Sequence, residues 1–128
     1  MRDIIFRGKR LDNGEWVCGS LIHQTEYYGD PVNRYHILYD GEFDWDYYSA
    51  EIVAPETIGQ YTGLKDKNGT KIFEGDIVRR NIINNVKAVE FYKGRFYPFI
   101  AFPEYNCWDE DECEIIGNIH DNPELLED

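Results

Sequence analysis

Apolar and polar residues alternate in short runs along most of this chain, and no long run has the period of a helix. Ile4 and Phe6 alternate with charged neighbours, and residues 15–22 return as a second extended run. A period of two is typical of half-buried strands. Between the runs, Asn13-Gly14 supplies the positive φ angles that a two-residue hairpin turn demands. The chain is therefore predicted to open with a β-hairpin.

Turn residues interrupt the pattern in the next segment. Gly29, Pro31 and Asn33 punctuate residues 23–34, which are predicted to form a loop. Residues 35–39 and the aromatic run 43–48 are strand candidates. After a break at Pro55, residues 56–61 are expected to continue as a strand.

The second half repeats strands and turns more regularly. A second Asn-Gly pair, Asn68-Gly69, predicts a hairpin bend. Gly75 is expected to provide a bulge or tight turn, and Asp76 a side-chain bond back to the turn backbone. Further strands are predicted at residues 70–73, 77–79, 86–92, 95–102 and 114–120. Residues 121–126 predict one short helical turn, capped by Asn122.

These patterns predict a mainly β protein of small antiparallel sheets and hairpins with very little helix. We expect two parts, an N-terminal β-hairpin subdomain at residues 1–58 and a C-terminal part at residues 59–128 with an acidic tail. The short strands of the second part favour an SH3-like barrel or a related small sheet.

Charge is unevenly distributed in this chain of 128 residues, whose net charge is −12. Residues 59–95 carry eight basic and four acidic side chains, whereas residues 96–128 carry ten acidic and no basic ones. So acidic a chain repels nucleic acid and anionic lipid, which makes nucleic-acid binding unlikely. The simplest expectation is that the basic block pairs with the acidic tail in the folded chain.

The sequence shows neither a membrane span nor a signal peptide, and this bears on the expected compartment of the protein. No apolar run approaches the length of a membrane span. Residues 1–10 are charged and lack the apolar core of a signal peptide. We therefore expect a cytoplasmic protein, in which Cys18, Cys107 and Cys113 are reduced and buried thiols.

Candidate reactive groups do not form a known motif. Asp40, Glu42, Asp44 and Asp46 alternate in a way that suits either a cation site or, more simply, a solvated face of a strand. The cysteines lack zinc-site spacing, and the serines lie outside nucleophile motifs. An acid–base pair of His120 and Asp121, joined by Asp76, stays an alternative. No catalytic residue, metal or cofactor is predicted.

Two surfaces are candidates for binding. Asp109, Glu110, Asp111 and Glu112 form an acidic cluster that either mimics DNA phosphates toward a basic partner or serves as a solvated loop. Basic residues of the second half interleave with aromatic ones, as in surfaces that stack single-stranded nucleic acid. That set is Arg79, Arg80, Lys87, Phe91, Tyr92, Lys93, Arg95, Phe96 and Tyr97.

Three segments resemble the YopX-like proteins of phages and prophages. They are the opening Arg2-Asp3-Ile4-Ile5-Phe6-Arg7, residues 57–78 (TIGQYTGLKDKNGTKIFEGDIV), and residues 114–126 (EIIGNIHDNPELL). The resemblance implies a mainly β fold, oligomerisation and a phage-accessory role, and it transfers no catalytic residue. We call residues 57–78 the motif segment.

The preferred hypothesis is a non-enzymatic protein-interaction module of phage or prophage origin. It is expected to form a homo-oligomer or to bind a host or phage protein, with the basic block of one copy meeting the acidic tail of another. The alternative is an acidic decoy that inhibits a host DNA-binding protein through Asp109, Glu110, Asp111 and Glu112.

Overall fold

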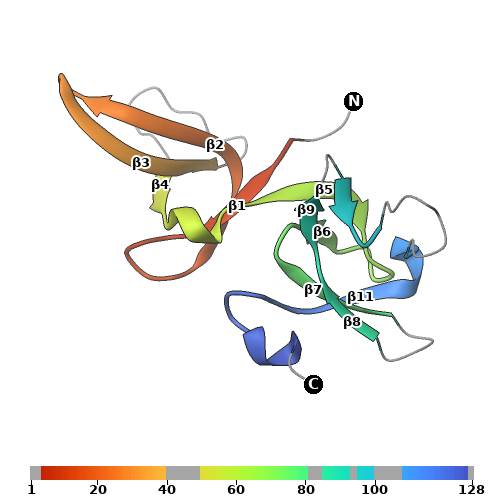
Figure 1. Cartoon of the computed structure of the whole chain (residues 1–128). Coiled ribbons are helices and arrows are strands. Elements are labelled where there is room, and N and C mark those ends of the chain that lie inside the picture. The colour runs from red at the N-terminus through yellow and green to blue at the C-terminus, as the bar shows by residue number, and fades with distance from the viewer. Residues whose placement is uncertain (1–3, 40–49, 81–84, 93–94, 100–107, 127–128) are drawn as a thin grey trace. The chain divides into compact units, whose positions relative to one another are not determined.

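The computed structural model describes residues 4–39, 50–80, 85–92, 95–99 and 108–126. The chain divides into two compact units, Met1–Gln60 and Tyr61–Asp128. Both consist of short antiparallel strands, and the described residues contain no α-helix (Figure 1). The protein is therefore mainly β, as predicted. The predicted boundary falls after residue 58, and independent folding of either part stays a prediction.

Unit 1 is an antiparallel sheet with the strand order β4-β3-β2-β1-β5. Its core consists of Val17, Ile37 and Val53, against which Phe6, Leu21, Tyr35 and Ile58 pack. The elements are β1 (Phe6–Lys9), β2 (Trp16–Tyr27), β3 (Asp30–Tyr39), β4 (Ala50–Val53), the 3₁₀ turn η1 (Pro55–Thr57), and the start of β5 (Gly59–Lys65).

The strand predicted at residues 56–61 begins later than expected, because η1 occupies its first part. Thr57 is buried there, and its hydroxyl donates to the Ala54 carbonyl at 2.6 Å. The same oxygen accepts the Lys9 amide at 2.9 Å. These two bonds hold a turn where the sequence pattern suggested extended chain.

The loop predicted at residues 23–34 is wrong. β2 and β3 form one long hairpin whose ladder runs from Gly19↔Tyr39 to Tyr27↔Asp30. We call its outer part, residues 20–37, the arm. β1 pairs with β2 only up to Gly19, and β4 pairs with β3 only from Tyr35 onward. Most side chains of the arm are exposed, on both faces of the hairpin. These strands therefore show no alternation of apolar and polar residues in the sequence.

The first hairpin is confirmed, but its two-residue turn is wrong. The Arg10 amide donates to the Glu15 carbonyl at 2.9 Å, so four residues form the loop. Gly14 has a positive φ of 74°, whereas Asn13 does not. Instead, the Asn13 side chain accepts the Glu15 amide at 2.9 Å. This local bond satisfies the loop without the left-handed asparagine that a two-residue turn needs.

Unit 2 contains three small antiparallel pairings: β5 with β6, the three-stranded sheet β11-β7-β8, and the β10-β9 ribbon. Its core consists of Ile72, Val78, Val89, Phe96, Phe99, Trp108 and Cys113. The elements after β5 are β6 (Lys71–Phe73), β7 (Asp76–Arg80), β8 (Asn85–Ala88), β9 (Glu90–Tyr92), β10 (Arg95–Tyr97), the 3₁₀ turn η4 (Glu110–Glu112), β11 (Cys113–Asn118) and the 3₁₀ turn η5 (Pro123–Leu126).

Three strand predictions in unit 2 are too long, and one of them, residues 114–120, ends at Asn118 in β11. The run 86–92 is split into β8 and β9 at Val89, whose amide and carbonyl bond to Asp76 and Gly75. β10 ends at Tyr97, before Pro98, which has no amide to donate to a ladder. No closed barrel is found among the described strands, so an SH3-like barrel stays a prediction. Across the described segments, no helix has the length and apolar character needed to cross a membrane.

Candidate functional site

Asp66 organises the second Asn-Gly corner. The side chain is buried, with 5% of its surface exposed. Its Oδ1 accepts the amides of Asn68 and Thr70, both at 2.9 Å. Its Oδ2 accepts the amide of Ile115 at 3.1 Å. One carboxylate therefore closes the β5–β6 bend and ties it to β11, joining the motif segment to the closing segment that also resembles the family.

Gly75 and Asp76 form a second junction of the same kind. Gly75 has a φ of 93°, a conformation that glycine adopts without steric cost. Its amide donates to Val89 and its carbonyl accepts from Ile119. Asp76 is 2% exposed, and its Oδ2 accepts the Phe73 amide at 2.7 Å. The predicted turn at Gly75 and the predicted Asp76 bond are both confirmed.

The two buried carboxylates of the motif segment therefore bind backbone amides. A buried amide without an acceptor costs about 1–3 kcal/mol, so such bonds maintain the fold. Asp121, the other carboxylate of the acid–base alternative, accepts the side-chain amide of Asn118 at 3.0 Å. The structure thus gives Asp66, Asp76 and Asp121 structural partners. The acidic run at residues 40–46 lies outside the described residues.

The acidic cluster is partly paired inside unit 2. Asp109 is exposed, while Glu110 and Glu112 are half-buried on η4. Glu112 Oε2 lies 3.8 Å from Arg80 Nε on β7. Asp111 belongs to η4, and the structure does not describe its side chain. Of the described carboxylates of this candidate surface, Asp109 is the most exposed.

Glu114 adds a second link between the acidic tail and the basic block. Arg79 donates a hydrogen bond to its carboxylate, and Lys67 lies 3.8 Å from the other oxygen. The hydrogen bond from Arg79 lowers the pKa of Glu114 below its usual value, and the charges of Arg79 and Lys67 lower it further. Together with Glu112–Arg80, these contacts confirm that basic and acidic residues of the two blocks pair within the folded chain.

The cysteines differ in environment. Cys113 is fully buried, and burial raises the pKa of its thiol to about 11, so it stays protonated at neutral pH. Cys18 is exposed, so the expectation of a buried thiol is wrong there. Its neighbours in β2, Val17 and Gly19, are buried, so exposure alternates along this part of the strand. Cys107 lies outside the described residues, which hold no group of three or more His, Cys, Asp or Glu arranged for a metal ion.

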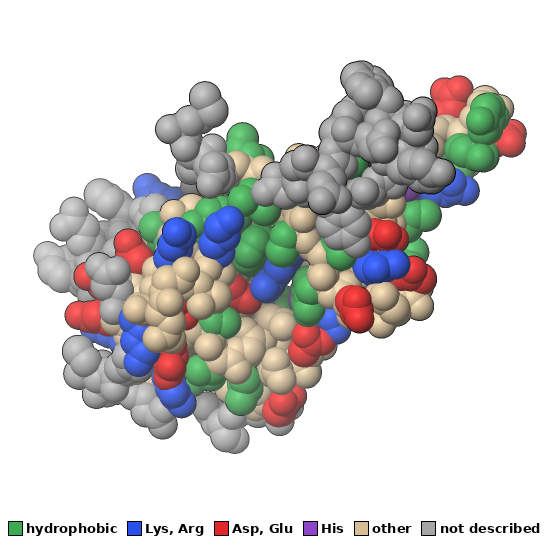
Figure 2. Space-filling model, turned by 180° about the vertical axis from the view of Figure 1, so that it is seen from behind, with side chains coloured by type: hydrophobic (Ala, Val, Ile, Leu, Met, Phe, Trp, Pro, Cys, Tyr) green, Lys and Arg blue, Asp and Glu red, His purple; other side chains and the backbone are tan. Residues whose placement is uncertain are grey.

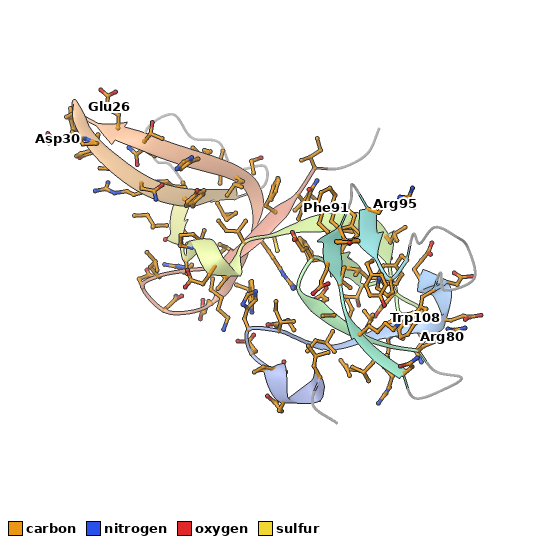
Figure 3. All side chains as sticks on the ribbon, in the orientation of Figure 1. Glu26, Asp30, Arg80, Phe91, Arg95 and Trp108 are labelled. Carbon is orange, nitrogen blue, oxygen red and sulfur yellow. The ribbon has the colours of Figure 1, made fainter. Side chains whose placement is uncertain are left out.

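The basic–aromatic set separates into a buried part and an exposed part. Phe96 is 7% exposed, and the charged groups of Arg80 and Lys87 lie 5.5 and 5.2 Å from the ring centroid of Trp108, a buried residue outside the set. In contrast, Phe91 and Tyr92 of β9 are 54% and 62% exposed. Figure 3 shows Phe91 and Arg95 on the β9–β10 ribbon, with Arg80 beside Trp108. Within this set, the exposed aromatic residues are therefore Phe91 and Tyr92 on the β9–β10 ribbon.

The tip of the arm is a surface that sequence reasoning missed. Tyr27 is 49% exposed and Tyr28 is 91% exposed, and their rings meet edge to face at 4.6 Å. Glu26 and Asp30 flank them (Figure 3). In Figure 2, hydrophobic side chains at the end of the arm lie beside acidic ones, at the upper right. The available signal was a tyrosine pair directly before glycine in a polar segment without apolar alternation.

Comparisons with known proteins agree with the sequence resemblance. A family model described as "YopX protein" matches residues 5–127. No curated protein matches the chain. Among solved structures, the chain is similar to protein EF1440 from Enterococcus faecalis, with 26% sequence identity and a TM-score of 0.57. That match covers 99% of this chain and 100% of EF1440. The chain therefore belongs to the YopX protein family.

Proposed function

We propose that this protein is a non-enzymatic accessory protein of phage or prophage origin that works in the cytoplasm through protein–protein contact. The observation that supports this most is the use of Asp66 and Asp76, the buried carboxylates of the motif segment, as acceptors for backbone amides. When the residues typical of a family maintain its scaffold, the activity is expected on a surface outside them.

The partner is proposed to be a second copy of the chain, a host protein or a phage protein. Arg79, Arg80 and Lys67 already have acidic partners in their own unit. A contact between the basic block of one copy and the acidic tail of another would therefore compete with these pairs. This makes exposed aromatic residues the better candidates for the contact, since buried aromatic anchors dominate protein interfaces.

An SH3-like barrel in unit 2 is a further part of the proposal. Support comes from backbone bonds that link its small sheets: Gly75 to Val89, Ile119 to Gly75, and Lys67 to Cys113. Short strands joined at their ends in this way are typical of small barrels. A complete set of strand-to-strand amide contacts from NMR would test closure, and an open ladder at either edge would contradict it.

The test of the interaction role combines two measurements on the full chain. Light scattering at low and high salt measures self-association, and cross-linking in phage-infected cells captures partners. We expect a mass above that of the monomer, or one partner recovered by the wild type and lost on mutation of an exposed surface. A strict monomer at low salt that also yields no such partner would contradict the proposal.

The second candidate is an acidic decoy for a host DNA-binding protein. It is favoured by the exposure of Asp109 at the start of η4. Asp109→Lys with Glu110→Lys should abolish recovery of such a protein, whereas Glu124→Lys, an exposed acidic residue on η5, should not. Equal recovery by both variants would remove the decoy hypothesis.

A further inference from the structure

Ile37 of the arm belongs to the core of unit 1, and beyond that core polar side-chain contacts link the two strands of the arm. The ring of His23 stacks on Tyr35 with centroids 4.3 Å apart, and its Nε2 lies 2.7 Å from Asn33 Oδ1. Further along, Gln24 contacts His36 at 3.1 Å and donates to the Glu26 carbonyl at 3.0 Å. These contacts lie on both faces of the arm and hold its two strands together, so that the tip is presented in one conformation.

The tip has an unfavourable residue in its turn. Tyr27 pairs with Asp30, so Tyr28 and Gly29 form a two-residue loop. Both have positive φ, 47° and 85° respectively, as a type I′ turn requires. Asparagine, aspartate or glycine fills such a first position at less cost than tyrosine, which is rarely left-handed. A bulky residue kept in a strained and exposed conformation points to a role in binding.

The chemistry of the tip indicates what it would bind. Exposed Tyr27 lies directly opposite Asp30, Glu26 lies opposite Pro31, and the charged group of Arg34 is 5.3 Å from the Tyr27 ring centroid. Such a surface suits a partner that offers aromatic rings beside a cation, because rings pack on rings and carboxylates attract the cation.

The chain itself carries a surface of that description. On the β9–β10 ribbon, Tyr92 is 62% exposed and lies directly opposite exposed Arg95, on the same face. Phe91 is 54% exposed on the other face, where it pairs with buried Phe96. Glu90 lies further along the ribbon, opposite Tyr97.

We propose that the tip of the arm docks on the β9–β10 ribbon of a second copy of this chain. The tyrosines would pack against Tyr92 while Asp30, which lies opposite Tyr27 in the arm, faces Arg95. Two copies that exchange arms about a two-fold axis form this contact twice and close the assembly. The inference rests on the proposed protein-interaction function and names its partner and surface.

The first test is Tyr28→Gly in the full chain, followed by sedimentation equilibrium over a range of concentrations. Loss of a tyrosine anchor is expected to raise the dimer dissociation constant about tenfold or more. Because glycine suits the turn, thermal unfolding of the variant should not occur at a lower temperature than for wild type when both are measured in dilute samples in which the wild type is monomeric. Leu11→Ser, an exposed apolar residue of unit 1 outside the arm, is the matched control and should dimerise normally.

The second test exchanges charges between the two surfaces. Glu26→Arg with Asp30→Arg, and separately Arg95→Glu, should each weaken dimerisation. An equal mixture of the two variants should recover it, because reversed tips meet reversed ribbons.

Each adverse outcome has one meaning. A wild type that stays monomeric, including one whose tip contacts its own chain, overturns the inference and leaves the proposed function to its other partners. A wild-type dimer that survives Tyr28→Gly unchanged, or a mixture that does not recover, places self-association on another surface and also overturns the inference.

Discussion

The motif segment and the arm are both built from hairpins, yet they use their polar and aromatic residues in opposite ways. In the motif segment, Asp66 and Asp76 are buried and accept backbone amides from neighbouring turns and strands. In the arm, Tyr27 and Tyr28 are exposed to solvent at the tip of the β2–β3 hairpin. The carboxylates of the motif segment therefore maintain the scaffold, whereas the surface that we propose for binding consists of residues that belong to no motif.

The largest effect is expected from Asp66→Ala. Removing the carboxylate leaves the amides of Asn68, Thr70 and Ile115 without their acceptor, and the free energy of unfolding should fall by about 3 kcal/mol. Urea unfolding followed by circular dichroism measures the change. Glu124→Ala, which removes an exposed carboxylate from the same unit, should stay within about 0.5 kcal/mol of wild type. Equal effects from both variants would remove the distinction between scaffold and surface carboxylates.

Gly75→Ala should have a smaller effect through the backbone. With φ at 93°, an alanine is forced into a conformation that costs about 1–2 kcal/mol. The free energy of unfolding should fall by that amount in the same urea experiment. A neutral result would mean that the junction with Val89 and Ile119 relaxes, contrary to the rigid role assigned to it.

Acid should reveal the pairing between the two charged blocks. The pKa of Glu114 is lower in the folded chain than its ordinary value of 4.5, chiefly because Arg79 donates to it. This stabilisation is therefore present above the pKa of the unfolded chain and is lost as pH falls through the lowered folded value. Glu114→Gln should be less stable than wild type at neutral pH, and the difference should vanish in acid. Urea midpoints against pH measure it, and a difference that is constant with pH would contradict the assignment.

The smallest effect on stability is expected at the arm. Tyr28→Gly removes a strained residue, but glycine also gives the unfolded chain more freedom, so stability should rise by no more than about 1 kcal/mol. Thermal unfolding measures the change. A loss of stability would mean that the tyrosine supports the fold, and the contrast between the two regions would then fail.

The sequence was informative where turn chemistry and burial act together. Asn-Gly corners, the Gly75 turn and the Asp76 bond could be predicted because glycine and aspartate have local conformational roles. The β2–β3 arm could not, because Gly29 belongs to its two-residue turn and Pro31 lies where β4 no longer pairs with β3. A proline on a stretch that is paired on one side only, here with Glu26, resembles a loop residue because the segment around it carries no apolar pattern.

The contacts of the candidate site were harder to predict than the turns, because most of them depend on residues that are distant in sequence. The pairing of acidic tail and basic block followed from charge alone, and Arg79–Glu114 is one instance. The partners of Asp66 lie almost fifty residues apart in sequence, and the exposure of Tyr28 depends on a turn that the pattern did not reveal. Long-range hydrogen bonds and solvent exposure are properties of the fold, so local patterns do not report them.

Amide hydrogen exchange at two protein concentrations would test the contrast between the motif segment and the arm most directly. The amides that Asp66 and Asp76 accept, those of Asn68, Thr70, Phe73 and Ile115, should exchange slowly and at the same rate in dilute and concentrated samples. Amides of residues 26–30 should exchange rapidly when dilute and more slowly when concentrated. If the amides around Asp66 and Asp76 changed with concentration and those of the arm did not, binding would lie in the motif segment and the account would be contradicted.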